Sequence, residues 1–374
     1  MQNNKPRLYG ETIGIIGGGQ LGRMMATMAR HMGYRLIVLD PTPNCPAAQI
    51  ADQQIVASYD DLDAVKQLAE RSDVVTYEFE NVDLSAARYL ELEGLLPQGA
   101  HSLEITQDRE KEKQAMVKSN QPVAPFSIVS NEVDLKTATE TIGFPAVVKT
   151  CRGGYDGKGQ IKLATHADLH HAKSLLAESD RLIYEAWVDF DCEISVVFTR
   201  AKNGQIIFFP IGENIHRDHI LHTTIVPARV EPIVIERAKQ AAVAIAETID
   251  VVGTFAIELF VKNTDIYINE LAPRPHNSGH YTIEACNVSQ FEQHIRAICG
   301  LPLLPVHFHG AAVMVNLLGD NLNDYFTDVN RLNQGHVHMY GKDEIKLKRK
   351  VGHVTFVGQE LDQLLDQLKT ESLI

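Results

Sequence analysis

The sequence predicts a mixed fold: a parallel α/β domain, then an α+β domain that is largely antiparallel, then a small β-rich domain. Three observations predict it. At a typical size of about 150 residues per domain, 374 residues suggest two or three domains. Short apolar runs alternate with helical periodicity up to residue 80, whereas strand patterns dominate the middle of the chain. Beyond Pro302 and Pro305, strand patterns continue to about residue 357, before a final amphipathic helix.

The first domain is expected to span residues 1–108. Its elements alternate: strands at 13–16, 35–40 and 73–79, with helices at 21–32 and from near 60. Strands separated by helices pair in parallel through crossover connections. The charge run 108–113, followed by breakers at Asn120, Pro122 and Pro125, marks the boundary.

The second domain is expected to span residues 109–302 and the third 303–374. Strands are predicted at 144–150, 161–164, 182–188, 192–201, 205–210, 254–261 and 265–271. Helices are predicted at 133–142, 166–177, 231–250 and 282–299. No internal repeat is found.

Composition excludes several classes of protein. The net charge of −13 argues against nucleic acid or anionic lipid as a partner, so any anionic ligand needs a local site. The five cysteines are scattered, with no C-x-x-C pair, which indicates a reduced, cytoplasmic setting without disulfides. We expect no export signal, because residues 1–12 are polar, and no membrane span, because acids interrupt the most apolar stretch, 241–261.

A glycine motif lies between the first strand and helix. Residues 17–22 read GGGQLG and satisfy G-x-G-x-x-G, and Asp40 ends the next strand where a ribose-binding acid is expected. Alone, the pattern predicts a Rossmann-like dinucleotide domain, but a tight strand-to-helix turn fits equally well. Asp40 could also simply end its strand. Glu78, at the carboxyl end of a strand, is either a ligand-binding acid or a solvated strand end.

A second glycine cluster, residues 152–160, joins two strands and reads RGGYDGKGQ. It is too long for a hairpin turn and lacks the P-loop pattern, so we interpret 153–160 as a mobile loop that closes over phosphates. Lys149 ends the strand that feeds this loop. A buried cation needs a partner, and we expect an anionic ligand to supply it; a lysine that reaches solvent is the alternative.

The segment 182–188 combines the only tryptophan, Trp187, with Glu185 in an apolar run. That is typical of a hinge that binds adenine, although core packing explains Trp187 as well. Glu258 and Glu270 fall in two successive strands. If these form a hairpin, both carboxylates face one side and suit a magnesium ion that carries phosphates.

The segment 272–280 is dense in hydrogen-bond donors. His276 and His280 have zinc-like spacing, but Pro275 and Gly279 disfavour the helix that would align them, so we discount zinc. The group suits a small oxyanion. In the tail, the basic run 346–350 with Lys342 is either solvated charge or a phosphate site.

Taken together, these motifs resemble the ATP-grasp superfamily and, within it, the 5-(carboxyamino)imidazole ribonucleotide synthase family. The narrower resemblance rests on GGGQLG at 17–22, YEFEN at 77–81, GGYDGKGQ at 153–160 and APRPHNSGH at 272–280. It implies a three-domain enzyme in which ATP lies between two lobes of the central domain. The implied reaction is carboxylation of aminoimidazole ribonucleotide by bicarbonate with ATP, through carboxyphosphate, in purine biosynthesis.

The resemblance also implies site residues. Those expected to contact ATP are Arg109, Lys149, Gly154, Tyr155, Asp156, Gly157, Lys158, Gly159, Gln160, Glu185, Ala186, Trp187, Val188, Glu193, His216, Asn269 and Glu270. Those expected to act in catalysis are Arg274, His276, Asn277, Tyr155, Asp156 and Lys342. Those expected to bind the ribonucleotide are Gln20, Leu21, Glu78, Lys342 and Arg349. Magnesium is expected at Glu258 and Glu270; Ala272 stands where many members have a further Asn ligand. A homodimer is implied as well.

Other functions would use parts of the same pattern. Within the fold, formate-dependent glycinamide ribonucleotide transformylase and biotin carboxylase are the neighbours. A nicotinamide-dependent oxidoreductase would explain residues 17–22 and Asp40 but not the second glycine loop or the paired glutamates. A non-catalytic nucleotide sensor would not need the donors at 274–280.

Overall fold

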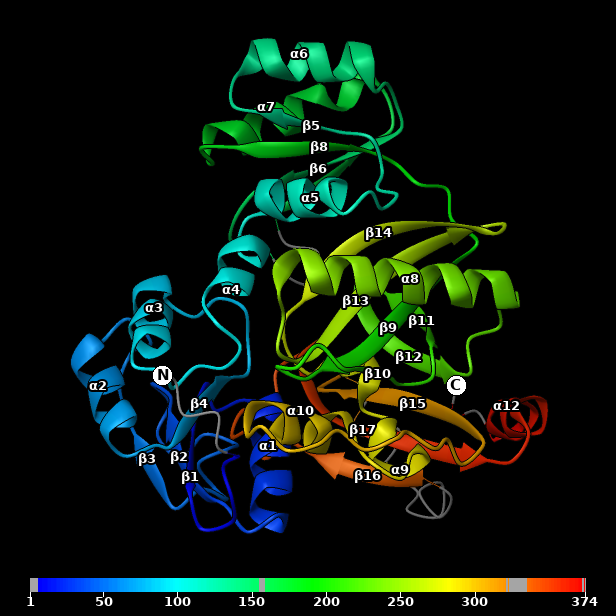
Figure 1. The fold of residues 1–374 in the computed structure, drawn as a ribbon. Coiled ribbons are helices and arrows are strands. Elements are labelled where there is room, and N and C mark those ends of the chain that lie inside the picture. Colours follow the sequence, from blue (N-terminus) through cyan, green and yellow to red (C-terminus); the bar gives the residue numbers. More distant parts are fainter. Residues whose placement is uncertain (1–5, 155–158, 321, 323–334, 372, 374) are drawn as a thin grey trace.

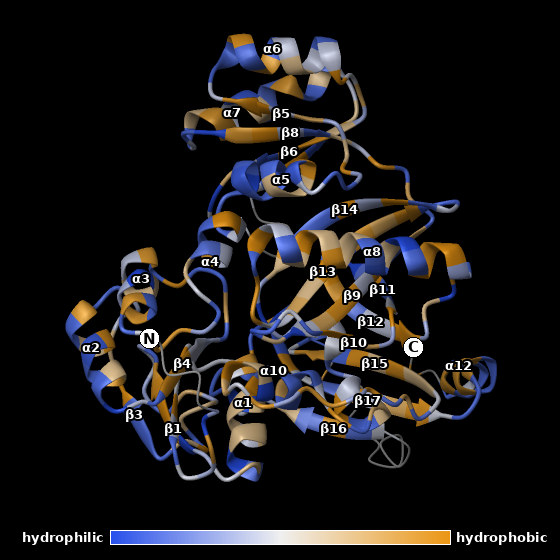
Figure 2. Cartoon of the chain, in the orientation of Figure 1, coloured by the Kyte–Doolittle hydropathy of each residue, from blue (hydrophilic) through white to orange (hydrophobic). Residues whose placement is uncertain are grey.

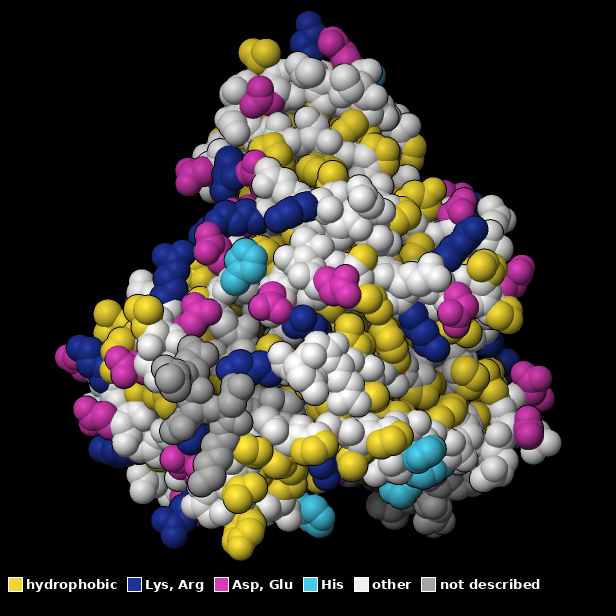
Figure 3. Space-filling model, viewed as in Figure 1, with side chains coloured by type: hydrophobic (Ala, Val, Ile, Leu, Met, Phe, Trp, Pro, Cys, Tyr) yellow, Lys and Arg dark blue, Asp and Glu magenta, His cyan; other side chains and the backbone are white. Residues whose placement is uncertain are grey.

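The structure is a computed structural model that describes residues 6–154, 159–320, 322, 335–371 and 373 (Figure 1). It confirms the predicted mixed architecture, with one parallel sheet and two antiparallel sheets. Figure 2 shows hydrophobic residues concentrated along the strands, whereas the helices carry hydrophilic residues on their outer sides. On the face drawn in Figure 3, positive and negative side chains are interspersed.

The first domain is a parallel sheet with helices on both faces. Its strands are β1 (Thr12–Ile16), β2 (Arg35–Leu39), β3 (Gln53–Ile55) and β4 (Val74–Tyr77), in the order β3-β2-β1-β4. Its helices are α1 (Gln20–His31), α2 (Leu62–Glu70), α3 (Leu84–Leu92) and α4 (His101–Thr106). Asp61 and Asp83 cap α2 and α3 by accepting hydrogen bonds from their first backbone amides. The alternation of elements therefore gave the correct parallel pairing, although it missed β3 and α3.

Helix α5 (Arg109–Lys118) leads into a small lobe. The lobe's strands are β5 (Phe126–Val129), β6 (Ala146–Thr150), β7 (Gln160–Leu163) and β8 (Leu182–Ala186), all antiparallel in the order β5-β8-β6-β7. Helix α6 (Glu132–Thr141), the turn η1 (His166–Asp168) and helix α7 (Leu169–Ala177) complete it. In Figure 1 the lobe stands apart at the top, with α6 and α7 above its sheet and α5 below.

The large sheet runs through the central and C-terminal parts of the chain. Its strands are β9 (Cys192–Arg200), β10 (Ile206–Phe208), β11 (Gly212–Arg217), β12 (Ile220–Val226), β13 (Gly253–Lys262), β14 (Asp265–Ala272), β15 (Ala311–Leu318), β16 (Gly335–Met339) and β17 (Lys350–Gly358). The order is β14-β13-β9-β11-β12-β15-β17-β16, with β10 beside β9. Helix α8 (Pro232–Ile249) packs its apolar side on this sheet, and α12 (Leu361–Thr370) packs on β15 and β17. Strands β15 to β17 therefore extend the sheet that bears the central domain.

The predicted helix over residues 282–299 is wrong. The structure has a single turn, α9 (Thr282–Ala285), and a separate helix, α10 (Gln290–Ile298). Between them, Asn287 bonds to the backbone of Pro305 and His307, while Ser289 caps α10 through the amide of Glu292. These local side-chain bonds compete with a continuous helix, which the apolar periodicity does not reveal.

Helix α10 also connects the domains. It packs with α1 in one hydrophobic cluster, and His294 lies 2.8 Å from the Thr76 hydroxyl of the first domain. The other ring nitrogen of His294 accepts the amide of Thr254 on β13. No helix among the described residues is long and apolar enough to span a membrane.

Candidate functional site

Two acids of the first domain hold the glycine-rich turn between β1 and α1. Asp40 accepts the amide of Gly18 at 2.7 Å and the hydroxyl of Tyr59 at 2.6 Å. Glu78 accepts the amides of Gly19 and Gly22, the latter at 2.6 Å. Both carboxylates are buried. The acid expected to meet a ribose, Asp40, is therefore committed to the turn and its neighbouring strand, which does not support the dinucleotide interpretation.

Glu78 lies at the carboxyl end of β4, next to the start of α1, where Gln20 and Leu21 lie. Burial raises the pKa of Glu78, whereas the two glycine amides and the charge of Lys342 oppose that rise. Lys342, in the C-terminal region, thus helps to lower the pKa of an acid in the first domain. Its ammonium also donates to the carbonyl of Lys350 at 2.8 Å.

A buried group of charges lines the side of the small lobe that faces α5. Lys149 on β6 lies 3.2 Å from Glu185 on β8, and Lys113 of α5 lies 3.2 Å from the other oxygen of Glu185. The expectation that a ligand must supply the partner of Lys149 is wrong, because Glu185 supplies one. Burial alone would raise the pKa of Glu185, but the two lysines outweigh it and lower the pKa to about 2. The group retains a surplus positive charge, which suits an anion.

The chain leaves the lobe through Ala186, Trp187 and Val188. The amides of Ala186 and Trp187 bond to the carbonyls of Pro125 and Pro145 at 2.8 and 3.0 Å. The ammonium of Lys162 on β7 lies 3.5 Å from the centre of the Trp187 ring. Trp187 is partly exposed, so core packing does not explain it. A cation over the ring instead holds this aromatic group at the edge of the lobe.

The glycine loop is described at both ends. The carbonyl of Gly159 accepts the amide of Thr150 at 2.8 Å, and a Cβ at Gly159 would lie 2.7 Å from the Thr150 hydroxyl. With φ at +71°, this position requires glycine. Gln160 pairs with Lys149 across the strands, and Gly154 precedes the gap. Tyr155, Asp156, Gly157 and Lys158 lie outside the described residues.

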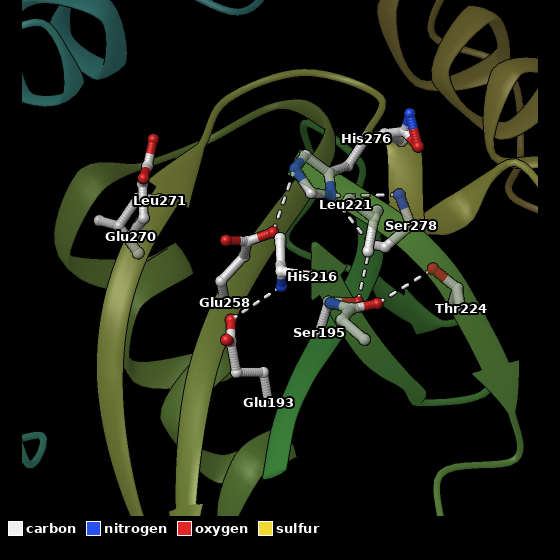
Figure 4. A network of polar contacts seen from close by, with 12 residues as sticks. Glu193, Ser195, His216, Leu221, Thr224, Glu258, Glu270, Leu271, His276 and Ser278 are labelled. Atoms are coloured by element: carbon white, nitrogen blue, oxygen red, sulfur yellow. Dashed lines mark hydrogen bonds and ion pairs between the residues drawn. The ribbon is translucent and has the colours of Figure 1, made fainter. Parts of the chain in front are cut away.

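The predicted glutamate hairpin is confirmed. Strands β13 and β14 pair antiparallel with Glu258 opposite Glu270, next to a register shift after Glu258. Arg109 of α5 lies 3.9 Å from Glu270, and Asn269 precedes Glu270 on the strand. Figure 4 shows Glu258 in contact with His276 and, as a separate pair, His216 in contact with Glu193, with Glu270 to one side on the neighbouring strand.

His216 on β11 pairs with one acid of this sheet and feels the charge of a second. Its Nδ1 lies 3.2 Å from Glu193 on β9. Burial lowers the pKa of His216, but the contact with Glu193 outweighs burial and leaves the pKa above its ordinary value. The charge of Glu258 acts in the same direction. The ring of His216 therefore holds its proton more readily than a free histidine does.

The two glutamates fit a divalent cation. Burial and the nearby charge of Glu270 raise the pKa of Glu258 to about 7, which indicates two carboxylates held close against their mutual repulsion. The described residues contain no cluster of three or more His, Cys, Asp or Glu side chains that could hold a metal. Ala272 offers no oxygen in its side chain. The remaining ligands of a magnesium ion would therefore come from phosphate oxygens and water.

The segment after β14 places one donor against the first domain and another against the glutamate hairpin. Arg274 forms an ion pair with Glu80 of the first domain, and its guanidinium lowers the pKa of Glu80 against the effect of burial. His276 lies 3.5 Å from Glu258 and 2.8 Å from the Ser278 hydroxyl. Burial holds the pKa of His276 well below its ordinary value, so the ring is neutral.

Asn277 differs from what we expected of a free oxyanion donor. Its amide exchanges hydrogen bonds with that of Asn316 on β15, at 3.0 and 2.7 Å. Both side chains are buried. Because Asn316 also donates to the carbonyl of Leu221, this amide pair fastens the turn η2 (Asn277–Gly279) to β12 and β15. In this structure Asn277 therefore orients the turn that bears His276.

The basic tail lies near both the first domain and the glutamates. Arg349 is exposed and donates to the carbonyl of Glu344 at 3.2 Å. The charge of Lys350, at the start of β17, acts on Glu258, His216 and His276. The structure thus brings residues from all three parts of the chain to one region.

Sequence reasoning missed four charged residues of this region. They are Glu80, Glu112, Lys113 and Lys350. Glu80 is the second acid of the YEFEN segment, so that motif could have found it. Glu112 and Lys113 fall in a charge run interpreted only as marking a domain boundary, and both are buried. Lys350 ends the basic run that was treated as a whole.

Family models match three parts of the chain. A ribonucleotide synthetase preATP-grasp domain matches residues 10–107, an ATP-grasp domain matches 114–291, and a phosphoribosylaminoimidazole carboxylase C-terminal domain matches 312–367. The N5-carboxyaminoimidazole ribonucleotide synthase of Bacillus subtilis is 48% identical over 360 residues, which cover 96% of this chain and 94% of the relative. That of Staphylococcus aureus strain COL is 44% identical over 357 residues, 95% of each chain.

Solved structures agree with these sequence matches. An ADP complex of an N5-carboxyaminoimidazole ribonucleotide synthetase has a TM-score of 0.95 and 49% identity, covering 98% of this chain and 97% of its own. The Aspergillus clavatus synthase in complex with ADP and 5-aminoimidazole ribonucleotide has a TM-score of 0.90 and 29% identity, covering 96% and 97%.

Proposed function

The chain belongs to the N5-carboxyaminoimidazole ribonucleotide synthase family of ATP-grasp enzymes, and from that premise we propose how its residues divide the reaction among themselves. It is an ATP-dependent ligase that carboxylates aminoimidazole ribonucleotide in purine biosynthesis. We propose that bicarbonate is the carboxyl donor and that ATP activates it as carboxyphosphate, with ADP and phosphate as the other products.

ATP lies between the small lobe and the glutamate hairpin in this proposal. Lys149 and Arg109 meet the phosphates, and the Glu185 to Val188 segment, with Trp187, meets the adenosine. The other proposed nucleotide contacts are Gly154 to Gln160, Glu193, His216, Asn269 and Glu270. What supports this assignment is the surplus positive charge around Glu185, which a polyphosphate would neutralise.

Glu258 and Glu270 would hold magnesium, which when bound neutralises phosphate charge and makes the γ-phosphorus a better electrophile. The chain's own groups do the rest. A bicarbonate oxygen attacks the γ-phosphorus, the bond from that phosphorus to the bridging oxygen breaks, and ADP leaves. Lys149 offsets the charge that shifts onto the phosphoryl oxygens.

In the second step the exocyclic amine attacks the carboxyl carbon, the bond from that carbon to the bridging oxygen breaks, and phosphate leaves with the proton that the nitrogen loses. We propose that Arg274 and His276 hold the carboxyl oxygens. Asn277 orients the turn that bears His276 through its hydrogen bonds to Asn316 of β15. Tyr155 and Asp156 orient the amine. Carboxyphosphate breaks down in water, so we propose that the glycine loop at 153–160 keeps water away from it.

The ribonucleotide lies between the first domain and the tail. We propose that Gln20, Leu21 and Glu78 meet its ribose and base, and that Lys342 and Arg349 bind its 5′-phosphate. The side chain of Gln49, in the first domain, donates to the carbonyl of Gly341 at 2.8 Å, and this contact next to Lys342 supports the arrangement.

The observation that carries the proposal is the position of Arg109 and Lys113 between the Lys149–Glu185 pair and Glu270. The test measures ADP release with magnesium and ATP while aminoimidazole ribonucleotide and bicarbonate are supplied singly and together. Release that needs the ribonucleotide, with labelled bicarbonate entering an acid-labile product, is expected. Turnover instead on formate with glycinamide ribonucleotide, or on biotin, would overturn the substrate assignment and keep the fold.

We further propose a homodimer in the cytoplasm. The resemblance to the family supports the dimer, and the five cysteines, all free in the structure, support a reducing compartment. Sedimentation equilibrium at micromolar protein should give twice the 41.6 kDa chain mass.

A further inference from the structure

Two neighbouring residues of α5 hold the backbone on both sides of Glu270. The ammonium of Lys113 lies 3.4 Å from the carbonyl oxygen of Ile268 and 3.2 Å from that of Asn269. A carboxylate oxygen of Glu112 accepts the amide of Leu271 at 2.7 Å. The contacts therefore bracket Glu270 along the strand.

These contacts lie on the side of β14 that does not pair with β13. Strand β14 is the edge of the large sheet, so within the described part of the chain no strand pairs with its outer backbone groups. On that side, Pro122 accepts the amide of Ile268 at 2.8 Å, and α5 supplies the partners further along. The register shift between Glu258 and Leu259 also interrupts the pairing on the inner side at this point.

The cost of burying the two side chains points the same way. Lys113 and Glu112 are each 2% exposed. Charged groups are seldom buried to this extent without a specific set of partners. Three backbone groups within four consecutive residues of β14 supply part of that set, and Glu185 supplies the rest for Lys113.

The same helix is fixed to the small lobe. Asp108, which caps α5, is fully buried and pairs with Arg152 and Arg181 at 3.0 and 2.8 Å. Lys113 also pairs with Glu185 of β8. In Figure 1, α5 lies below the small lobe's sheet and above the large sheet. Helix α5 thus connects the backbone at Glu270 to the lobe that bears Lys149.

We propose that Glu112 and Lys113 are positioning residues that fix the carboxylate of Glu270 for a divalent cation bound together with the nucleotide. The inference rests on the role proposed for Glu270. Neither residue touches the substrate in this account; each acts through the backbone of β14. Residues that orient metal ligands in this manner typically change metal affinity about 10- to 100-fold when removed.

The experiment measures Mn²⁺ bound to the ADP complex by electron paramagnetic resonance, and ADP binding by the fluorescence of Trp187, the only tryptophan. The variants are Lys113→Met and Glu112→Met, which remove the backbone contacts, and Glu112→Gln, which keeps an acceptor for Leu271. Lys111→Met is the matched control, because Lys111 lies on the same helix and pairs with Glu104 near the surface. Glu270→Gln is the reference for loss of the cation ligand.

We expect Mn²⁺ affinity to fall about tenfold or more in both methionine variants. Glu112→Gln should stay within about twofold of the native protein, and Lys111→Met should equal it. If Lys113→Met does not fold, the contrast between Glu112→Met and Glu112→Gln decides. A loss of thermal stability with native Mn²⁺ affinity in the folded variants would show a structural role only and overturn the inference.

Glu270→Gln separates this inference from the proposed function. If it lowers Mn²⁺ affinity while Lys113→Met and Glu112→Met bind Mn²⁺ normally, the positioning role is wrong and the role of Glu270 stands. If it binds Mn²⁺ normally, the role of Glu270 itself is wrong, and the positioning role is overturned with it.

Discussion

Asp40 accepts a hydrogen bond from the amide of Gly18 at 2.7 Å, which closes the glycine-rich turn from within its own domain. The same carboxylate oxygen accepts the hydroxyl of Tyr59, and burial raises the pKa of that hydroxyl further above its ordinary value, as does the bond to Asp40. A sequence pattern typical of dinucleotide binding thus serves here to hold a turn.

Asp40→Ala should lower the free energy of unfolding by about 2 kcal/mol, because a buried amide and a buried hydroxyl lose their acceptor. Asp63→Ala, at an exposed acid of α2, should change it by less than about 0.5 kcal/mol. Urea unfolding measures both. Native stability in Asp40→Ala, or binding of NADH by the native protein, would contradict the structural role.

Glu185→Gln should destabilise the fold by about 3 kcal/mol at pH 7, because it leaves two buried lysines without their shared counter-charge. The pKa of about 2 in the folded state lies below the ordinary 4.5, so the carboxylate stabilises fully above pH 4.5 and progressively less as pH falls toward 2. The difference between native and variant unfolding free energies should therefore shrink between pH 5 and pH 3.

Urea unfolding at several pH values checks this prediction. Glu247→Gln, at an exposed position of α8, is the control and should show a small difference at every pH. The prediction fails if the difference in unfolding free energy between Glu185→Gln and the native protein stays constant down to pH 3. That result would mean that the lysines do not keep the carboxylate ionised.

Glu258→Gln and Glu270→Gln should each lower magnesium-dependent ADP formation by about a hundredfold or more while leaving the fold intact, because the cation loses one of its two protein ligands. Glu104→Gln, at a surface acid that pairs with Lys111, should retain native activity. Circular dichroism establishes folding, and a coupled assay measures ADP. Normal turnover in either hairpin variant would remove that residue from the cation site.

The parts of the fold that the sequence predicts are those with a strong local pattern. Runs of apolar residues predict strands β1 and β2, which pair in parallel. They also predict the β13–β14 hairpin, in which Glu258 lies opposite Glu270. Bonds made by Asn287 and Ser289 interrupt the predicted helix at 282–299, and such bonds leave no periodic trace.

The partners of charged residues are harder to predict, because they depend on elements far apart in the chain. Lys149 contacts Glu185 because β6 and β8 are neighbours in the folded sheet. Lys113 contacts both Glu185 and β14 because α5 lies between the small lobe and the large sheet. A charge run is usually solvated, so burial of Glu112 and Lys113 follows from the tertiary fold and not from their local sequence.

Arg349→Ala should raise the KM for aminoimidazole ribonucleotide about tenfold while changing the KM for ATP by less than about twofold, because one charge-assisted contact to a phosphate is worth about 1.5–3 kcal/mol. Lys348→Ala is the matched control, since Lys348 is an exposed neighbour that pairs with Asp218. Steady-state ADP release, with each substrate varied in turn, measures both constants. The exposed guanidinium of Arg349 donates one hydrogen bond among the described residues, to the carbonyl of Glu344, so its loss should cost little stability. Equal increases in both KM values would show that Arg349 is not part of a phosphate site for the ribonucleotide. A similar increase in Lys348→Ala would show that the KM depends on the overall positive charge of the tail and not on Arg349 itself.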